Sequence, residues 1–149
     1  YGYRQSGVED QGWVAWFTFA AMLGLPITIY GNGKQVRDLL FIDDLVNAYQ
    51  LAWKNIDQTK GQIFNLGGST KHSLSILEIL PILEKNLSVK IKHTFSDWRP
   101  GDQPIYISDI TKAKQVFGWE PKVSPEAGLK KLIAWAQENK SLLEKIFGK

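Results

Sequence analysis

The first part of the chain has apolar residues at every third or fourth position, which is the spacing of one face of a helix. The residues at this spacing are Val14, Phe17, Ala20, Ala21 and Leu23. The pattern predicts a helix over residues 11–23. Gly24 and Pro26 follow it. We expect the helix to end there, because glycine readily adopts the left-handed conformation of a helix end and proline cannot continue a helix.

Two β-prone runs come next and flank a glycine-rich stretch. Residues 27–30 are β-branched or aromatic, and residues 36–42 are again rich in apolar side chains. Gly31, Asn32 and Gly33 lie between the two runs. Because Asn-Gly between β-prone runs is a strong hairpin signal, the pattern predicts a strand, a tight turn and a second strand.

The same turn contains two short patterns that are known from enzymes. Tyr30 and Lys34 have the Tyr-x-x-x-Lys spacing of a dehydrogenase acid/base pair, and Gly31-x-Gly33 begins like a dinucleotide-binding loop. The first pattern needs a helix, where residues four apart share a side, but each glycine costs about 1 kcal/mol in a helix interior. The second has Val36 at the third glycine position. Neither pattern therefore predicts a site in this turn.

The rest of the chain is predicted to mix helices and strands without an uninterrupted βαβ series. Asp43 or Asp44 is placed to cap a helix, and Ser75 begins the Ser-x-x-Glu pattern of a capping box. Pro81 lies within the helix that follows, so we expect a kink or a late start there. The other expected elements are a short buried strand over residues 61–66, a strand over residues 89–95, a helix over residues 109–117 stopped by Gly118, and a last helix opened by Ser124, Pro125 and Glu126.

Composition indicates one globular domain and excludes several kinds of site. The chain has 149 residues, of which 44% are hydrophobic and 22% charged. It has no cysteine, which excludes disulfides and thiolate zinc sites and makes a cytoplasmic location the expectation. Its two histidines do not suffice for a metal site. No apolar run approaches the ~18 residues that span a membrane, and the lysines, which give a net charge of +3, are interleaved with acids rather than clustered for nucleic acid.

Two arginines are the candidate binding residues. Arg37 follows the glycine turn on a predicted strand, where its guanidinium is a fixed fork for phosphate oxygens. The alternative is an ion pair of Arg37 with Asp38 or another nearby acid. Arg99 and Asp102 flank a Pro-Gly bend, which lets a cation for phosphate and a carboxylate for sugar hydroxyls share one space. The alternative there is a self-satisfied turn in which Arg99 stacks on Trp98.

Several segments together resemble the C-terminal portion of the NAD-dependent epimerase/dehydratase family, the extended short-chain dehydrogenases that act on nucleotide sugars. The segments are Tyr1-Gly2, residues 29–33, Val36-Arg37-Asp38, Asp43-Asp44, residues 64–68, residues 99–102, and Lys112-Ala113-Lys114 ahead of residues 118–121. The resemblance implies a mixed α/β (α+β) fold that forms the substrate-binding part of an extended Rossmann-type epimerase. It covers residues 1–149, with residues 43–68 expected to belong to a nucleotide-binding sheet that this chain lacks.

The resemblance also implies which residues bind a nucleotide sugar. Arg37 and Arg99 match the positions that clamp the diphosphate, and Asp102 matches an acceptor for a hydroxyl near the ribose. Thr28 and Tyr30 match the positions that hold the base, through the main chain and through a ring face.

Two further positions are implied at the start of the first helix. Trp13 and Val14 match residues whose backbone amides can meet a phosphate. Trp13 departs from the smaller residue that is usual in the family, and Tyr3 replaces the proline of the family's opening segment.

The cofactor implied by the resemblance is NAD, bound by the parent enzyme. The family's NAD fingerprint, its catalytic Ser or Thr and its Tyr-x-x-x-Lys pair all lie upstream of the position that Tyr1 matches. We therefore expect this chain to be a piece of a longer protein, with no catalytic or cofactor-binding residue of its own and no activity alone. An apolar face without its sheet predicts self-association, and the expected assembly is a homo-oligomer.

The expected substrate is a CDP-linked 3,6-dideoxyhexose that is epimerised at C2. This expectation depends on residues 7–17 and 97–103, which look most like family members with that substrate. The alternatives are an epimerase or dehydratase acting on UDP- or dTDP-glucose, and a basic interaction module whose binding to nucleic acid or protein would be salt-sensitive. No membrane and no nucleic-acid partner is predicted.

Overall fold

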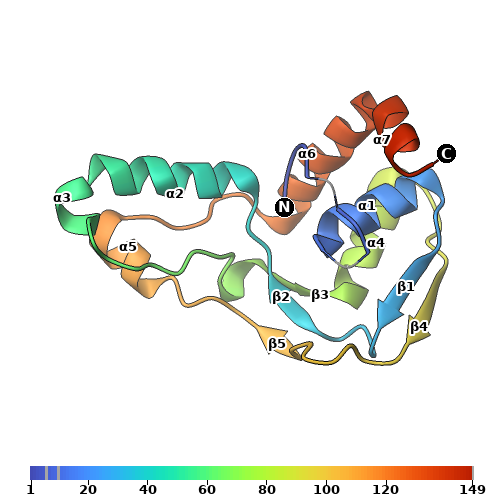
Figure 1. Cartoon of the computed structure of the whole chain (residues 1–149), viewed down its shortest axis with the longest axis horizontal. Coiled ribbons are helices and arrows are strands. Elements are labelled where there is room, and N and C mark those ends of the chain that lie inside the picture. Colours follow the sequence, from blue (N-terminus) through green and yellow to red (C-terminus); the bar gives the residue numbers. More distant parts are fainter. Residues whose placement is uncertain (6, 10, 149) are drawn as a thin grey trace.

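The computed structural model describes residues 1–5, 7–9 and 11–148, which form a mixed arrangement of helices and short strands. Figure 1 shows the elements in chain order, namely α1 (Trp13–Leu23), β1 (Ile27–Tyr30), β2 (Val36–Asp38), α2 (Ile42–Lys54), α3 (Ile56–Thr59), a 3₁₀ helix (Thr70–His72), β3 (Ser73–Ser75), α4 (Ile76–Leu87), β4 (His93–Ser96), β5 (Ile105–Tyr106), α5 (Thr111–Phe117), α6 (Pro125–Glu138) and α7 (Lys140–Ile146). None of these helices is both long and apolar enough to cross a lipid bilayer.

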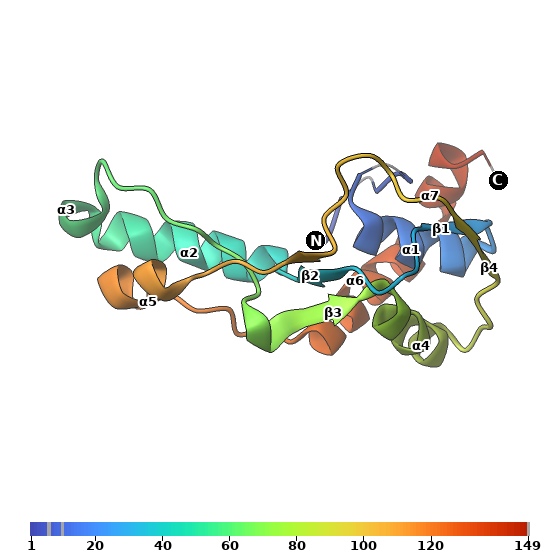
Figure 2. The ribbon, with the colours of Figure 1, turned by 90° about the horizontal axis from the view of Figure 1, so that it is seen from below.

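The molecule has a compact part and an arm. The compact part packs α1, α4 and α6 together with β1 around the largest apolar core, in which Ile29, Ile79 and Leu129 are fully buried. The arm contains α2, α3 and α5, and both Figure 1 and Figure 2 show it extending away from the compact part. Its own small core centres on Trp119 and Phe117. The two predicted classes of element, helices and strands in mixed order, are confirmed.

The predicted hairpin is wrong. β1 pairs with β4 in parallel, whereas β2 lies in a separate sheet between β3 and β5. Gly31 and Gly33, both with positive φ, carry the chain from one sheet to the other. A side chain at Gly31 would lie 2.6 Å from the Trp98 indole, so the turn also needs glycine for close packing. Long-range strand partners therefore outweigh the local turn signal.

Several predicted boundaries differ from those observed. β2 ends at Asp38 and α2 begins at Ile42, so the strand expected over residues 36–42 is short. Phe41, rather than Asp43 or Asp44, is the N-cap of α2. The Asp44 carboxylate instead accepts a hydrogen bond from the Val123 amide at 2.9 Å and ties α2 to the segment before α6.

The buried strand expected over residues 61–66 is also wrong. These residues form no strand, and the Ile63 side chain is 86% exposed. Phe64 packs edge-on against Phe117 with ring centroids 5.0 Å apart. The segment stays extended without a ladder because no described strand lies beside it to pair its main chain.

The helix ends follow the local chemistry more closely. Gly24 and Gly118 both end helices in the left-handed conformation, and the Ser124 hydroxyl accepts from the Ala127 amide at the start of α6. α5 begins at Thr111 and β4 at His93, each later than expected. α4 starts directly after Ser75, so the late start is wrong, and Pro81 lies inside the helix. α7 follows the helix that was expected to be last.

Ser75→Ala is expected to lower the free energy of unfolding by about 1 kcal/mol, because the Ser75 hydroxyl caps α4. Glu78 completes the capping box, and its hydrogen bonds from the Ser75 hydroxyl and amide hold the pKa of its carboxyl below the ordinary 4.5. That contribution is present above pH 4.5 and is lost as the pH falls through the lowered pKa of Glu78. Urea unfolding should show the difference from wild type narrowing in acid. Ser141→Ala in α7 is the control, with less than about 0.5 kcal/mol expected, and an equal loss in both variants would contradict the role of the cap.

Candidate functional site

A cavity of about 360 Å³ lies where α1, β1, β2 and the loop between β4 and β5 meet. Six of the seven residues predicted from the sequence line it, namely Trp13, Thr28, Tyr30, Arg37, Arg99 and Asp102. These residues come from three parts of the chain that are far apart in sequence. The fold therefore brings Arg37 and Arg99 to one hollow rather than to opposite surfaces.

Val14, the seventh predicted residue, has its side chain in the core rather than in the cavity. It is 4% exposed and belongs to the main apolar cluster. Its predicted role, however, concerns its backbone amide. Gly12 and Trp13 at the start of α1 line the cavity, and the first turn of α1 has no acidic residue. The first amides of a helix lack intrahelical partners, so this helix end offers N–H donors and partial positive charge.

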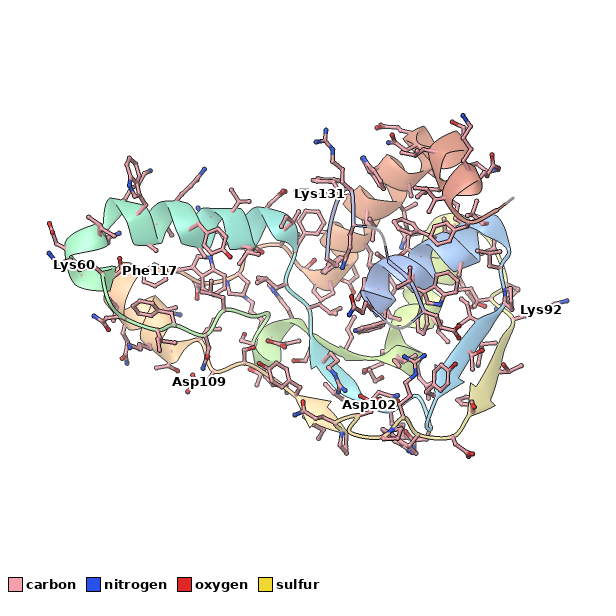
Figure 3. All side chains as sticks on the ribbon, viewed as in Figure 1. Lys60, Lys92, Asp102, Asp109, Phe117 and Lys131 are labelled. Atoms are coloured by element: carbon pink, nitrogen blue, oxygen red, sulfur yellow. The ribbon has the colours of Figure 1, made fainter. Side chains whose placement is uncertain are left out.

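Arg37 pairs with Asp102 across the cavity. One guanidinium nitrogen of Arg37 donates to the Asp102 carboxylate at 2.5 Å, and the other donates to the Val36 carbonyl at 2.9 Å. Figure 3 shows Asp102 on the loop beside β2. The Asp102 side chain is 26% exposed and that of Arg37 is 22% exposed. The ion pair expected as an alternative thus forms, and a water-filled cavity still reaches it.

Asp38 is not the partner of Arg37. One Asp38 carboxylate oxygen accepts from the backbone amides of Ser69 and Ser108 at 3.3 and 3.1 Å. These bonds fasten β2 to the loop before β3 and to the segment after β5. Asp38 thereby holds in place the strand that presents Arg37.

Arg99 lies over the ring of Tyr30, with its guanidinium carbon 3.7 Å from the ring centroid. It also donates to the Glu9 carbonyl at 3.4 Å. Trp98, the stacking partner expected for a self-satisfied turn, packs instead at Gly31. The loop between β4 and β5 therefore directs its cation at the end of β1.

Two lining residues, Glu9 and Gln35, were missed by sequence reasoning. The Tyr30 hydroxyl donates to the Glu9 carboxylate at 3.3 Å. Gln35 is 4% exposed, and its amide donates to the Tyr30 carbonyl at 2.6 Å across the glycine turn. A polar residue just ahead of a β-prone run could have drawn attention to Gln35. Glu9 had no such signal, because its place depends on how the segment before α1 packs. Asp10 in the same segment lies outside the described residues.

The lining chemistry suits a phosphorylated ligand with a flat ring. Two guanidinium groups and a helix start supply positive charge, while Asp102 can accept from hydroxyl groups and Tyr30 offers an aromatic face. Within residues 1–5, 7–9 and 11–148, no group of three or more histidine or acidic side chains is placed to hold a metal ion.

The comparison with known proteins agrees with this chemistry. A family model described as GDP-mannose 4,6 dehydratase matches residues 14–132. CDP-paratose 2-epimerase of Salmonella typhi is 39% identical over 140 residues, which cover 91% of this chain and 41% of that protein. The chain thus spans about two fifths of the length of this relative.

Two solved structures have the same fold as this chain. UDP-glucose 4-epimerase of Thermotoga maritima, solved with UDP-glucose, has a TM-score of 0.84 and 34% identity, and the match covers 94% of this chain and 44% of that one. UDP-glucuronic acid 4-epimerase of Bacillus cereus, in complex with UDP-glucuronic acid and NAD, has a TM-score of 0.81 and 31% identity, with coverage of 93% and 42%.

Proposed function

The chain belongs to the NAD-dependent epimerase/dehydratase family, and from that premise we propose that it forms the nucleotide-sugar-binding part of a sugar-nucleotide epimerase. The observation that carries the proposal is the meeting of Arg37 and Arg99 at one cavity with Asp102 between them. Two guanidinium groups can each direct paired N–H donors at phosphate oxygens, which matches the charge and geometry of a diphosphate.

In this proposal the diphosphate binds between the two arginines and displaces Asp102 from Arg37. Asp102 is then available to accept from a ribose hydroxyl. The backbone amides of Trp13 and Val14 at the start of α1 add donors for the phosphates. The base stacks at Tyr30 and meets the main chain of Thr28.

The residues of this chain do not form a binding loop for NAD, on which the family depends. A dinucleotide loop leads from a strand into a helix whose N-terminus faces the pyrophosphate. Here Gly31 and Gly33 lead from β1 into β2, another strand, and Val36 stands where the third glycine would be. Tyr30 and Lys34 lie across the same turn rather than on a helix. We therefore propose that this chain alone binds no NAD and does not catalyse epimerisation.

We further propose that residues 43–68 pack on a nucleotide-binding sheet supplied from outside this chain. One side of α2 and α3 carries four large apolar residues that are 46–75% exposed, namely Val46, Tyr49, Trp53 and Ile56. A continuous apolar face of this kind is normally covered. The homo-oligomeric state and the cytoplasmic location stay predictions from the sequence.

The finer proposal is that the whole enzyme epimerises CDP-paratose at C2 to CDP-tyvelose. It is supported by the similarity to the Salmonella protein over 91% of this chain. Members that act on UDP-linked sugars share the fold, so the identity of the base is the point that needs a test.

The test is thermal protection of the 149-residue chain by CDP, UDP and dTDP. At a nucleotide concentration of about 100 Kd, binding adds about 2.7 kcal/mol and should raise the Tm by about 5–10 °C. CDP is expected to protect at the lowest concentration. Absence of protection by all three nucleotides, together with salt-sensitive binding to RNA, would instead support a basic interaction module.

A further inference from the structure

The main chain of β1 offers hydrogen-bonding groups to the cavity. Thr28 is aligned with Thr94 of β4, and the Gly31 amide donates to the Ser96 carbonyl at 2.9 Å. Alternate residues of a strand direct their N–H and C=O groups to opposite edges. Gly31 therefore bonds to β4, whereas the main-chain groups of Thr28 face the other edge, where Thr28 lines the cavity.

These main-chain groups accept either pyrimidine. Uracil presents a ring N–H beside a carbonyl, and cytosine presents an unprotonated ring nitrogen beside an amino group. Each edge can therefore pair with one N–H and one C=O. The two bases differ at position 4, where cytosine has an amino donor and uracil or thymine has a carbonyl acceptor. Discrimination consequently needs a side chain that reads this position.

Glu9 is placed to be that side chain. It lines the cavity, and its carboxylate lies 3.3 Å from the hydroxyl of Tyr30, the ring assigned above to the base. Glu9 and Asp102 are the acids among the described lining residues, and Asp102 is directed at Arg37. An ionised carboxylate can only accept hydrogen bonds, so it attracts an amino group and repels a carbonyl oxygen.

We propose that Glu9 selects cytosine over uracil and thymine by accepting a hydrogen bond from the exocyclic amino group of the base. This inference rests on the proposed function, because it assumes that a nucleoside diphosphate occupies the cavity. It adds a residue that determines specificity, and it names CDP as the nucleotide of the substrate. Glu9 acts in this role without contacting the diphosphate.

The test is isothermal titration of CDP and of UDP into the full chain and into Glu9→Gln. Wild type is expected to bind CDP at least about tenfold more tightly than UDP. Glu9→Gln should bring that ratio to about one or reverse it, because an amide can donate to the uracil carbonyl at position 4. Glu138→Gln, which removes the same charge at the end of α6, should keep the wild-type ratio.

The outcomes separate the two proposals. An equal affinity of wild type for CDP and UDP, or a ratio that Glu9→Gln leaves unchanged, overturns the role of Glu9 while nucleotide binding still stands. A purely structural role of Glu9 at Tyr30 would weaken both nucleotides alike and also leave the ratio unchanged. Absence of binding of either nucleotide overturns the proposed function and the role of Glu9 with it.

Discussion

Arg37→Ala is expected to weaken the binding of CDP to this chain by about 100-fold, which corresponds to about 3 kcal/mol. The guanidinium of Arg37 is held in place by the Val36 carbonyl and by Asp102. Removing it takes away a charge-assisted contact with the diphosphate. It also leaves the Asp102 carboxylate unpaired beside the phosphates, where it repels them. The loss should therefore exceed that from a single neutral hydrogen bond. Isothermal titration measures it.

Two further variants separate charge from geometry. Arg37→Lys keeps the positive charge but loses the planar fork, so its loss should be intermediate, about tenfold. Arg4→Ala removes the same charge from an exposed position outside the cavity and should bind CDP like wild type. An Arg37→Ala chain that keeps the wild-type affinity while remaining folded would remove the physical basis for a diphosphate site.

Trp119→Ala is expected to lower the free energy of unfolding by about 3–5 kcal/mol. Trp119 is fully buried in the core of the arm, and its indole N–H donates to the Asp44 carbonyl at 2.9 Å. The substitution leaves a large cavity and an unpaired carbonyl. For a chain of this size the Tm should fall by about 10–15 °C. Urea and thermal unfolding followed by circular dichroism measure the change.

Trp53→Ala is the matched control. Trp53 lies on α2 in the same arm but is 75% exposed, so its removal should change stability by no more than about 0.5 kcal/mol. The pair compares one residue type in two environments. If Trp53→Ala destabilised the chain as much as Trp119→Ala, the exposed face of α2 would have to be covered in solution, for example by self-association.

The sequence predicts those parts of the fold that depend on neighbouring residues. Ser75 and Ser124 cap helices, and Gly24 and Gly118 end them, because each acts through the backbone within one turn. Strand pairing could not be predicted in this way. β1 and β2 are close in sequence, but their partners come from β4 and from β3 and β5.

The candidate site was predicted in part. Arg37, Arg99 and Asp102 came from motifs that resemble a known family, and each lines the cavity. Glu9 and Gln35 belong to the same cavity through tertiary packing alone. No local pattern marks Glu9, since its carboxylate meets Tyr30 only after the chain has folded α1 against β1.

The ion pair between Arg37 and Asp102 joins residues 65 positions apart. Bringing such distant segments together costs loop-closure entropy before any contact repays it, and contacts of long sequence separation form late in folding. The helical core around α1, α4 and α6 can assemble without this closure. The binding cavity is therefore completed among the last events of folding, and a ligand that bridges Arg37 and Arg99 acts as a fastener on the slowest contact in the chain.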